Sequence, residues 1–91
     1  MKKAVALHVY GKVQGVWFRA STQMKAEELG IAGVVMNDTD GSVYIEAEGD
    51  PSALAKFVQW CSRGPSHADV TKVEQNEIAV KGLRAFSIRR W

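Results

Sequence analysis

The segment Gly11–Arg19 has the sequence GKVQGVWFR, and the rest of the chain is arranged around it. It follows an alternating apolar stretch, turns at Gly15, and enters a helical pattern where Arg19 appears. The N–H groups of such a turn and of a first helical turn lack backbone acceptors and carry partial positive charge. The planar guanidinium of Arg19 adds donors whose geometry suits phosphate oxygens. The segment therefore predicts a loop that binds an anion such as a phosphoryl group.

The flanking sequence alternates with a period of two in some stretches and of three to four in others, which predicts strands and helices respectively. Gly30 follows the first helical pattern and suits a left-handed helix end. Asp40 and Gly41 suit a hairpin turn. The predicted elements are, in order, strand 4–10, helix 18–29, strand 31–37, strand 43–48, a helix from Pro51 to the stop at Gly64-Pro65, strand 70–75 and a short final strand from Phe86 to Trp91.

Each predicted element has one apolar face, which is expected to be buried. The positions are Val5, Leu7 and Val9; Phe18, Thr22, Ala26 and Leu29; Val43, Ile45 and Ala47; and Leu54, Phe57, Val58 and Cys61. In strand 70–75, Thr71 and Val73 are expected to share one face. The element order predicts an α+β, ferredoxin-like βαββαβ sandwich: a mainly antiparallel sheet, both helices packed on one face, and a short extra C-terminal strand. We expect the end of strand 31–37 to neighbour the end of strand 4–10, which brings Asn37 toward the Gly11–Arg19 loop.

Length and composition narrow the class of protein. A chain of 91 residues is long enough for one modest core, so residues 1–91 are expected to form a single domain. The net charge of +2 is too small to indicate a nucleic-acid partner. Cys61 is the only cysteine, which excludes an internal disulfide and a cysteine-based metal cage. No apolar run approaches the length of a membrane span, so we expect a cytoplasmic protein with no membrane partner.

Two stretches resemble the signatures of one known family. The segment Gly11–Arg19 is similar to the acylphosphatase signature Gly-x-Val-Gln-Gly-Val-x-Phe-Arg. The segment Gly33–Val43, with the sequence GVVMNDTDGSV, resembles the second signature of that family. The resemblance covers essentially the whole chain. It implies a small monomeric hydrolase that converts an acyl phosphate and water into a carboxylate and orthophosphate without a metal ion or cofactor.

The resemblance also implies roles for individual residues. Arg19 matches the arginine that binds the substrate phosphate, and Asn37 matches the asparagine that orients the attacking water. Orthophosphate is then expected to be both the product and a competitive inhibitor. Trp17 occupies a position at which the family varies, and its ring either covers the loop or supports the acyl part of the substrate. The implied substrate-binding residues are Gln14, Gly15, Val16, Trp17, Phe18 and Arg19, and the implied catalytic residues are Arg19 and Asn37.

These roles suit the chemistry of an acyl phosphate. Its leaving group is a carboxylate with a pKa of about 4, which departs without a proton and needs no general acid. Phosphoryl transfer passes through a loose transition state, so the water needs positioning more than deprotonation. A side-chain amide can position a water by accepting a hydrogen bond from it and donating one elsewhere. The lack of a histidine, cysteine or carboxylate with an assigned role is therefore consistent with this reaction.

Other phosphatase designs fit the sequence less well. A cysteine phosphatase places its thiolate five residues before an arginine, whereas Arg63 is two residues from Cys61, and Cys61 completes an apolar helix face. A metal phosphatase needs clustered ligands, whereas His8 and His67 are isolated in the sequence. No metal site is predicted.

A non-catalytic binding module is the alternative that the sequence leaves open. Small βαββαβ domains also bind phosphorylated ligands or RNA, and a fold alone does not determine function. An RNA-binding sheet normally presents aromatic side chains on its central strands. Tyr44 is the only aromatic residue of strand 43–48, and the same strand carries the acidic residues Glu46 and Glu48, which disfavours RNA.

Overall fold

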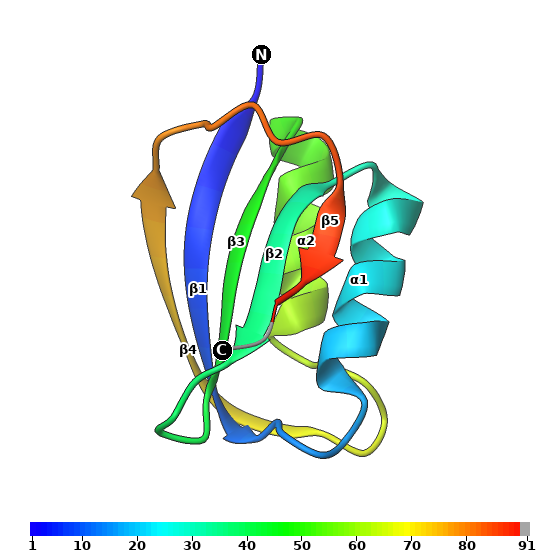
Figure 1. Cartoon of the computed structure of the whole chain (residues 1–91), viewed down its shortest axis with the longest axis vertical. Coiled ribbons are helices and arrows are strands. Elements are labelled where there is room, and N and C mark those ends of the chain that lie inside the picture. The colour runs from blue at the N-terminus through cyan, green and yellow to red at the C-terminus, as the bar shows by residue number, and fades with distance from the viewer. Residues whose placement is uncertain (90–91) are drawn as a thin grey trace.

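The computed structural model describes residues 1–89 as a five-stranded sheet with both helices packed on the same face (Figure 1). The predicted types and order of the elements are confirmed. The predicted extension of the last strand to Trp91 lies partly outside the described residues. The elements are β1 (Lys3–Lys12), α1 (Phe18–Leu29), β2 (Ala32–Asn37), β3 (Val43–Gly49), α2 (Pro51–Cys61), β4 (Asp69–Ile78) and β5 (Phe86–Ile88).

The strands are ordered β4-β1-β3-β2-β5 across the sheet. All neighbouring pairs are antiparallel except β2 and β5, which are parallel, so the predicted ferredoxin-like α+β fold with an extra C-terminal strand is confirmed. β3 lies between β1 and β2 and pairs with both of them. Since both are antiparallel to β3, they run in the same direction and end at the same edge of the sheet, at the bottom of Figure 1.

The core lies between the sheet and the helices. The apolar faces predicted for β1, β3 and the two helices are buried or half-buried. Phe57 packs edge-on against Phe86 with 5.8 Å between ring centroids, which joins α2 to β5. Thr22 is the polar member of the buried α1 face, and its hydroxyl donates to the carbonyl of Phe18 at 2.6 Å. This hydrogen bond removes the cost of burying an unpaired hydroxyl.

A β-bulge shapes the pairing of β4 with β1. Gly11 pairs with Val70, whereas the preceding residue of β1 pairs with Lys72, so Thr71 is an extra residue in β4. The prediction that Thr71 and Val73 lie on one face is therefore wrong: Val70 and Val73 pack against the core, and Thr71 is exposed. Gly11 has a φ of 123°, and a Cβ atom there would lie 2.1 Å from a carbonyl oxygen of β4. Only glycine fits this close approach.

Glu48 fixes the loop that leads from β4 to β5. Its side chain is only 3% exposed, yet its carboxylate accepts hydrogen bonds from the main-chain N–H groups of Lys81, Gly82 and Leu83, each at 3.0 Å. These three donors compensate for the burial of a charged group. The loop is thereby held against β3, and β5 follows it at the edge of the sheet beside β2.

Candidate active site

A cavity of about 450 Å³ lies where β1 gives way to α1 and where β2 ends. This volume falls within the range of small-molecule sites, about 300 to 1,000 Å³. It brings together Arg19 and Asn37, which are 18 positions apart in the sequence. The residues that line it are Val13, Gly15, Trp17, Phe18, Arg19, Ala20, Asn37 and Ile88.

The loop between β1 and α1 presents unbonded main-chain donors. Within residues 1–89, no main-chain N–H group of residues 13–19 donates a hydrogen bond. Gly15 and Trp17 both have left-handed backbones, with φ angles of 74° and 64°. Such a conformation is unusual for a bulky residue and reverses the direction of the chain within a few residues. The loop and the first turn of α1 therefore hold several N–H groups available to an anion.

Arg19 is the second residue of α1 and is half-buried at the cavity. Within residues 1–89, its guanidinium forms no ion pair with a carboxylate. It also lies in the first helical turn, where the helix dipole favours a negative ligand. Arg19 thus places a permanent positive charge beside the unbonded N–H groups.

Asn37 is the last residue of β2, and its amide lines the same cavity. Its Oδ1 atom is buried and has no hydrogen-bond partner within residues 1–89. Leaving a buried acceptor unpaired costs about 1 to 3 kcal/mol, so such atoms are rare in folded proteins. The arrangement therefore provides an acceptor for a small donor, such as a water molecule, beside Arg19.

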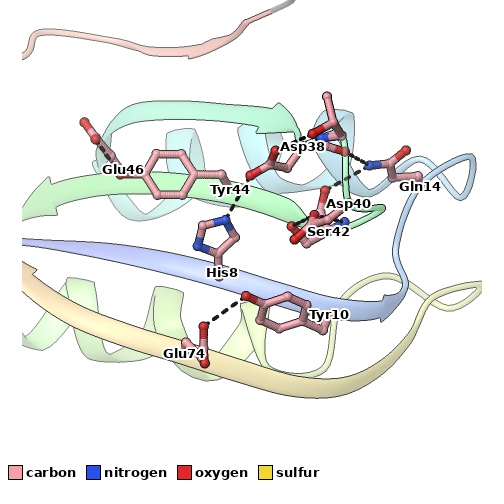
Figure 2. A network of polar contacts seen from close by, with 10 residues as sticks. His8, Tyr10, Gln14, Asp38, Asp40, Ser42, Tyr44, Glu46 and Glu74 are labelled. Atoms are coloured by element: carbon pink, nitrogen blue, oxygen red, sulfur yellow. Dashed lines mark hydrogen bonds and ion pairs between the residues drawn. The ribbon is translucent and has the colours of Figure 1, made fainter.

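The side chains of Gln14 and Val16 lie outside this cavity, although both residues belong to the predicted substrate-binding loop. Val16 is 7% exposed and packs in the core. The Nε2 atom of Gln14 donates to the carbonyls of Asp38 and Ser42, as Figure 2 shows. Their main-chain N–H groups stay within the unbonded loop, so their predicted role as amide donors to substrate stays a prediction. The structure brings the remaining predicted residues together at the cavity.

Two ionised carboxylates lie in the turn that follows Asn37. Asp38 is hydrogen-bonded to the Nε2 atom of His8 at 3.1 Å and accepts from the N–H of Thr39, and these contacts lower its pKa below the usual value (Figure 2). The hydroxyl and the N–H of Ser42 lower the pKa of Asp40 in the same way. Both groups are therefore negative at neutral pH and repel a nearby anion, and the positive charge of Arg19 opposes this repulsion.

Sequence reasoning missed several residues that surround the site. Val13, Ala20 and Ile88 line the cavity. The position of Ile88 could have been inferred from the sequence, because it lies two positions after the buried Phe86 and so faces the same side of the sheet. The contact between His8 and Asp38 could not have been inferred from any local pattern, since it joins residues that are 30 positions apart.

Cys61 is a core residue, as predicted from its helix face. It is fully buried, and this burial raises the pKa of its thiol, so the thiol stays protonated at neutral pH.

In residues 1–89 no three histidine, cysteine, aspartate or glutamate side chains lie close enough together to hold a metal ion. Neither described helix has the length and apolar character needed to cross a membrane.

Comparison with known proteins identifies the family. The sequence profile described as Acylphosphatase matches residues 5–88. A protein named acylphosphatase from Nocardioides sp. is 46% identical over 98% of this chain and 90% of its own length. Another, from Methylococcus capsulatus, is 49% identical over 97% of both chains. The crystal structure of acylphosphatase from Bacillus subtilis superposes with a TM-score of 0.94 at 38% identity, over 99% of this chain and 100% of that one. This chain belongs to the acylphosphatase family.

Proposed function

We propose that this chain hydrolyses acyl phosphates by direct attack of water on phosphorus. Membership of the acylphosphatase family supports the class of reaction. One observation carries the proposed mechanism: Asn37 lines the same cavity as Arg19, and its buried Oδ1 atom has no hydrogen-bond partner within residues 1–89. An acceptor for the nucleophile and a cation for the phosphoryl group thus lie in one site.

The phosphoryl group binds to the loop that follows β1. The unbonded N–H groups of residues 14–19 point partial positive charge at its oxygens, and Arg19 supplies a full positive charge. These donors are in place before the reaction, so little reorganisation is needed as charge spreads over the equatorial oxygens. Binding and transition-state stabilisation therefore come from the same groups.

Asn37 directs the attacking water. Its Oδ1 atom accepts a hydrogen bond from the water, which leaves the lone pair of the water oxygen aimed at phosphorus. A new P–O bond forms to the water oxygen, and the bond from phosphorus to the acyl oxygen breaks. The electron pair of that bond leaves with the carboxylate, and the proton lost by the water passes to a phosphate oxygen or to solvent. The products are a carboxylate and orthophosphate.

The leaving group sets the substrate class. A carboxylate with a pKa of about 4 departs as an anion, whereas an aryl oxide, with a pKa of about 10 by analogy with tyrosine, departs less readily. Among residues 1–89, the cavity lining contains no histidine, cysteine or carboxylate that would donate a proton to a basic leaving group. Phosphate esters should therefore be poor substrates, and we propose that no metal ion or other cofactor takes part.

The alternative of an RNA-binding module is not favoured. The open face of the sheet carries three aromatic rings, since His8 stacks on Tyr10 and lies 5.0 Å from Tyr44 between ring centroids. However, the hydroxyls of Tyr10 and Tyr44 donate to Glu74 and Glu46 respectively (Figure 2). Negative charge beside the rings opposes the phosphate backbone of a nucleic acid.

The remaining parts of the proposal concern the protein as a whole. We propose a single catalytic domain that acts as a monomer in the cytoplasm, without a nucleic-acid or membrane partner. A net charge of +2 and a single buried cysteine suit this description. Orthophosphate should compete with the substrate, because it offers the same oxygens to the loop and to Arg19.

A comparison of two matched substrates tests the proposed function. Benzoyl phosphate and phenyl phosphate share an aromatic ring and a phosphoryl group and differ in the basicity of the leaving group. We expect rapid hydrolysis of the first and far slower hydrolysis of the second. In water enriched in heavy oxygen, the label should appear in orthophosphate. Label in the benzoate would show attack on the carbonyl carbon, and equal rates on both substrates would contradict the role of the leaving group.

A further inference from the structure

The side chain of Gln14 joins the phosphate-binding loop to the turn that follows Asn37. Its Nε2 atom lies 2.8 Å from the carbonyl oxygen of Asp38 and 2.9 Å from that of Ser42 (Figure 2). Both partners are acceptors only, so the amide nitrogen must face them, and each of its two hydrogens can serve one carbonyl. The orientation of this side chain is therefore set by its surroundings.

The two carbonyls belong to the closed end of the β2–β3 hairpin. The N–H of Asp38 donates to the carbonyl of Ser42 at 2.8 Å, and the N–H of Gly41 donates to the carbonyl of Asp38 at 3.2 Å. Gln14 adds one further donor to each of these carbonyls from outside the hairpin. Asp38 directly follows Asn37, so Gln14 is bonded one residue away from the amide that faces the cavity.

Few other contacts fix the loop relative to Asn37. Within the described part of the chain, the bonds made by Gln14 are the only side-chain hydrogen bonds between residues 13–19 and residues 37–42. The main-chain N–H groups of the same loop are unbonded. The loop is otherwise anchored by the burial of Val13 and Val16, which places its apolar side but does not orient its donors.

We infer that Gln14 is a positioning residue that sets the distance between the bound phosphoryl group and the water held by Asn37. This inference rests on the proposed function. A shift of about 1 Å in such an arrangement can cost about a hundredfold in rate. Phosphate binding depends on the N–H groups and Arg19, which lie on one side of the bridge, so it should depend much less on Gln14. The expected signature is a fall in kcat with little change in the inhibition constant of orthophosphate.

The experiment compares Gln14→Ala with a matched control. Gln23 also donates from Nε2 to a main-chain carbonyl, that of Phe86, at 3.0 Å and with similar burial, but it does not line the cavity. We expect Gln14→Ala to lower kcat on benzoyl phosphate by about ten- to a hundredfold, and Gln23→Ala to leave it nearly unchanged. Orthophosphate inhibition should be similar in wild type and both variants.

Two further variants separate positioning from structure. In an Asn37→Ala background, Gln14→Ala should lower kcat little further, because the positioned group is already gone. Gln14→Glu keeps the shape of the side chain but places a carboxylate against two carbonyls. Its activity relative to wild type should rise as pH falls and the carboxyl becomes protonated, since it can then donate one hydrogen bond. Taking the ratio to wild type cancels the titration of the neighbouring His8, Asp38 and Asp40.

The outcomes are distinguishable. If Gln14→Ala lowers kcat no more than Gln23→Ala, or if its effect multiplies fully with that of Asn37→Ala, the positioning role is wrong. A proportional loss of orthophosphate binding would assign Gln14 to binding instead and would also overturn the inference. If Gln14→Ala does not fold, the isosteric Gln14→Glu variant and its pH profile decide the question. Failure of the wild type to hydrolyse benzoyl phosphate would refute the proposed function itself.

Discussion

Replacement of Arg19 by alanine removes the only positive charge that residues 1–89 place at the cavity lining, and it tests the binding half of the site. The guanidinium is half-buried beside a cavity open to water, so an effective dielectric constant of about 20 is appropriate. One charge pair at about 4 Å then contributes about 4 kcal/mol, of which the part specific to the transition state matters for kcat. Removal of a single preorganised donor typically costs about a hundred- to a thousandfold in rate. We expect a loss of kcat/KM of at least about a hundredfold.

The assay measures hydrolysis of benzoyl phosphate together with inhibition by orthophosphate. Arg19→Ala should weaken orthophosphate inhibition as well as catalysis, because the same cation serves both. Arg19→Lys should lie between wild type and Arg19→Ala, since it keeps the charge and loses the planar fork. Arg63→Ala is the control, as Arg63 is exposed and outside the cavity lining. Full activity in Arg19→Ala, with its fold intact by circular dichroism, would show that the guanidinium does not stabilise the phosphoryl group in the transition state.

Three further predictions concern the metal, the strained loop residue and acid stability. Activity should be unchanged by a chelator, and a loss that added metal restores would reject the metal-free mechanism. Trp17 is 80% exposed and has a φ of 64°. Because asparagine tolerates this backbone better, Trp17→Asn should raise the free energy of unfolding, measured in urea, by up to about 1 kcal/mol. An unchanged or lower free energy of unfolding would contradict this. The lowered pKa of Asp38 stabilises the fold above the unfolded value of about 4, and that contribution is lost as pH falls through the folded pKa. His8→Ala should raise the Asp38 pKa in an NMR titration and weaken the acid dependence of unfolding, and an unchanged pKa would count against the contact.

Local patterns were sufficient to predict the layers of the fold. Alternation in β1 and β3 and the apolar faces of the two helices each identified residues that are buried. Gly30 has the left-handed backbone expected of a helix end, with a φ of 71°. These signals are local because the spacing of apolar residues over a few consecutive positions indicates which face of a strand or helix is buried.

Non-local geometry was not accessible in the same way. Thr71 was wrongly placed on the same face of β4 as Val73, because a bulge depends on how two strands pair and not on the composition of either one. No strand order followed from the sequence either, and the position of β3 between β1 and β2 is known only from the structure.

For the candidate site, too, local motifs were predicted from the sequence, whereas contacts between distant residues were not. The motif residues Arg19 and Asn37 were named from sequence and lie at one cavity. Gln14 was predicted from sequence as a substrate-binding residue. Its side chain instead donates hydrogen bonds to two main-chain carbonyls that lie 24 and 28 positions away in the sequence. No local pattern indicates which main-chain carbonyl a glutamine will find, so the bridge appears only once the hairpin and the loop are placed together.

The most direct test of the account is the effect of Asn37→Ala on kcat, measured beside its effect on orthophosphate inhibition. Asn37 is proposed to hold the water and not the phosphoryl group, so kcat should fall by about a hundredfold or more while the inhibition constant changes little. Asn37→Asp keeps the shape of the side chain and adds a negative charge beside the phosphate, so it should impair both. Unchanged kcat in a folded Asn37→Ala protein, or a loss of activity explained entirely by weaker phosphate binding, would contradict the claim that this amide directs water at phosphorus.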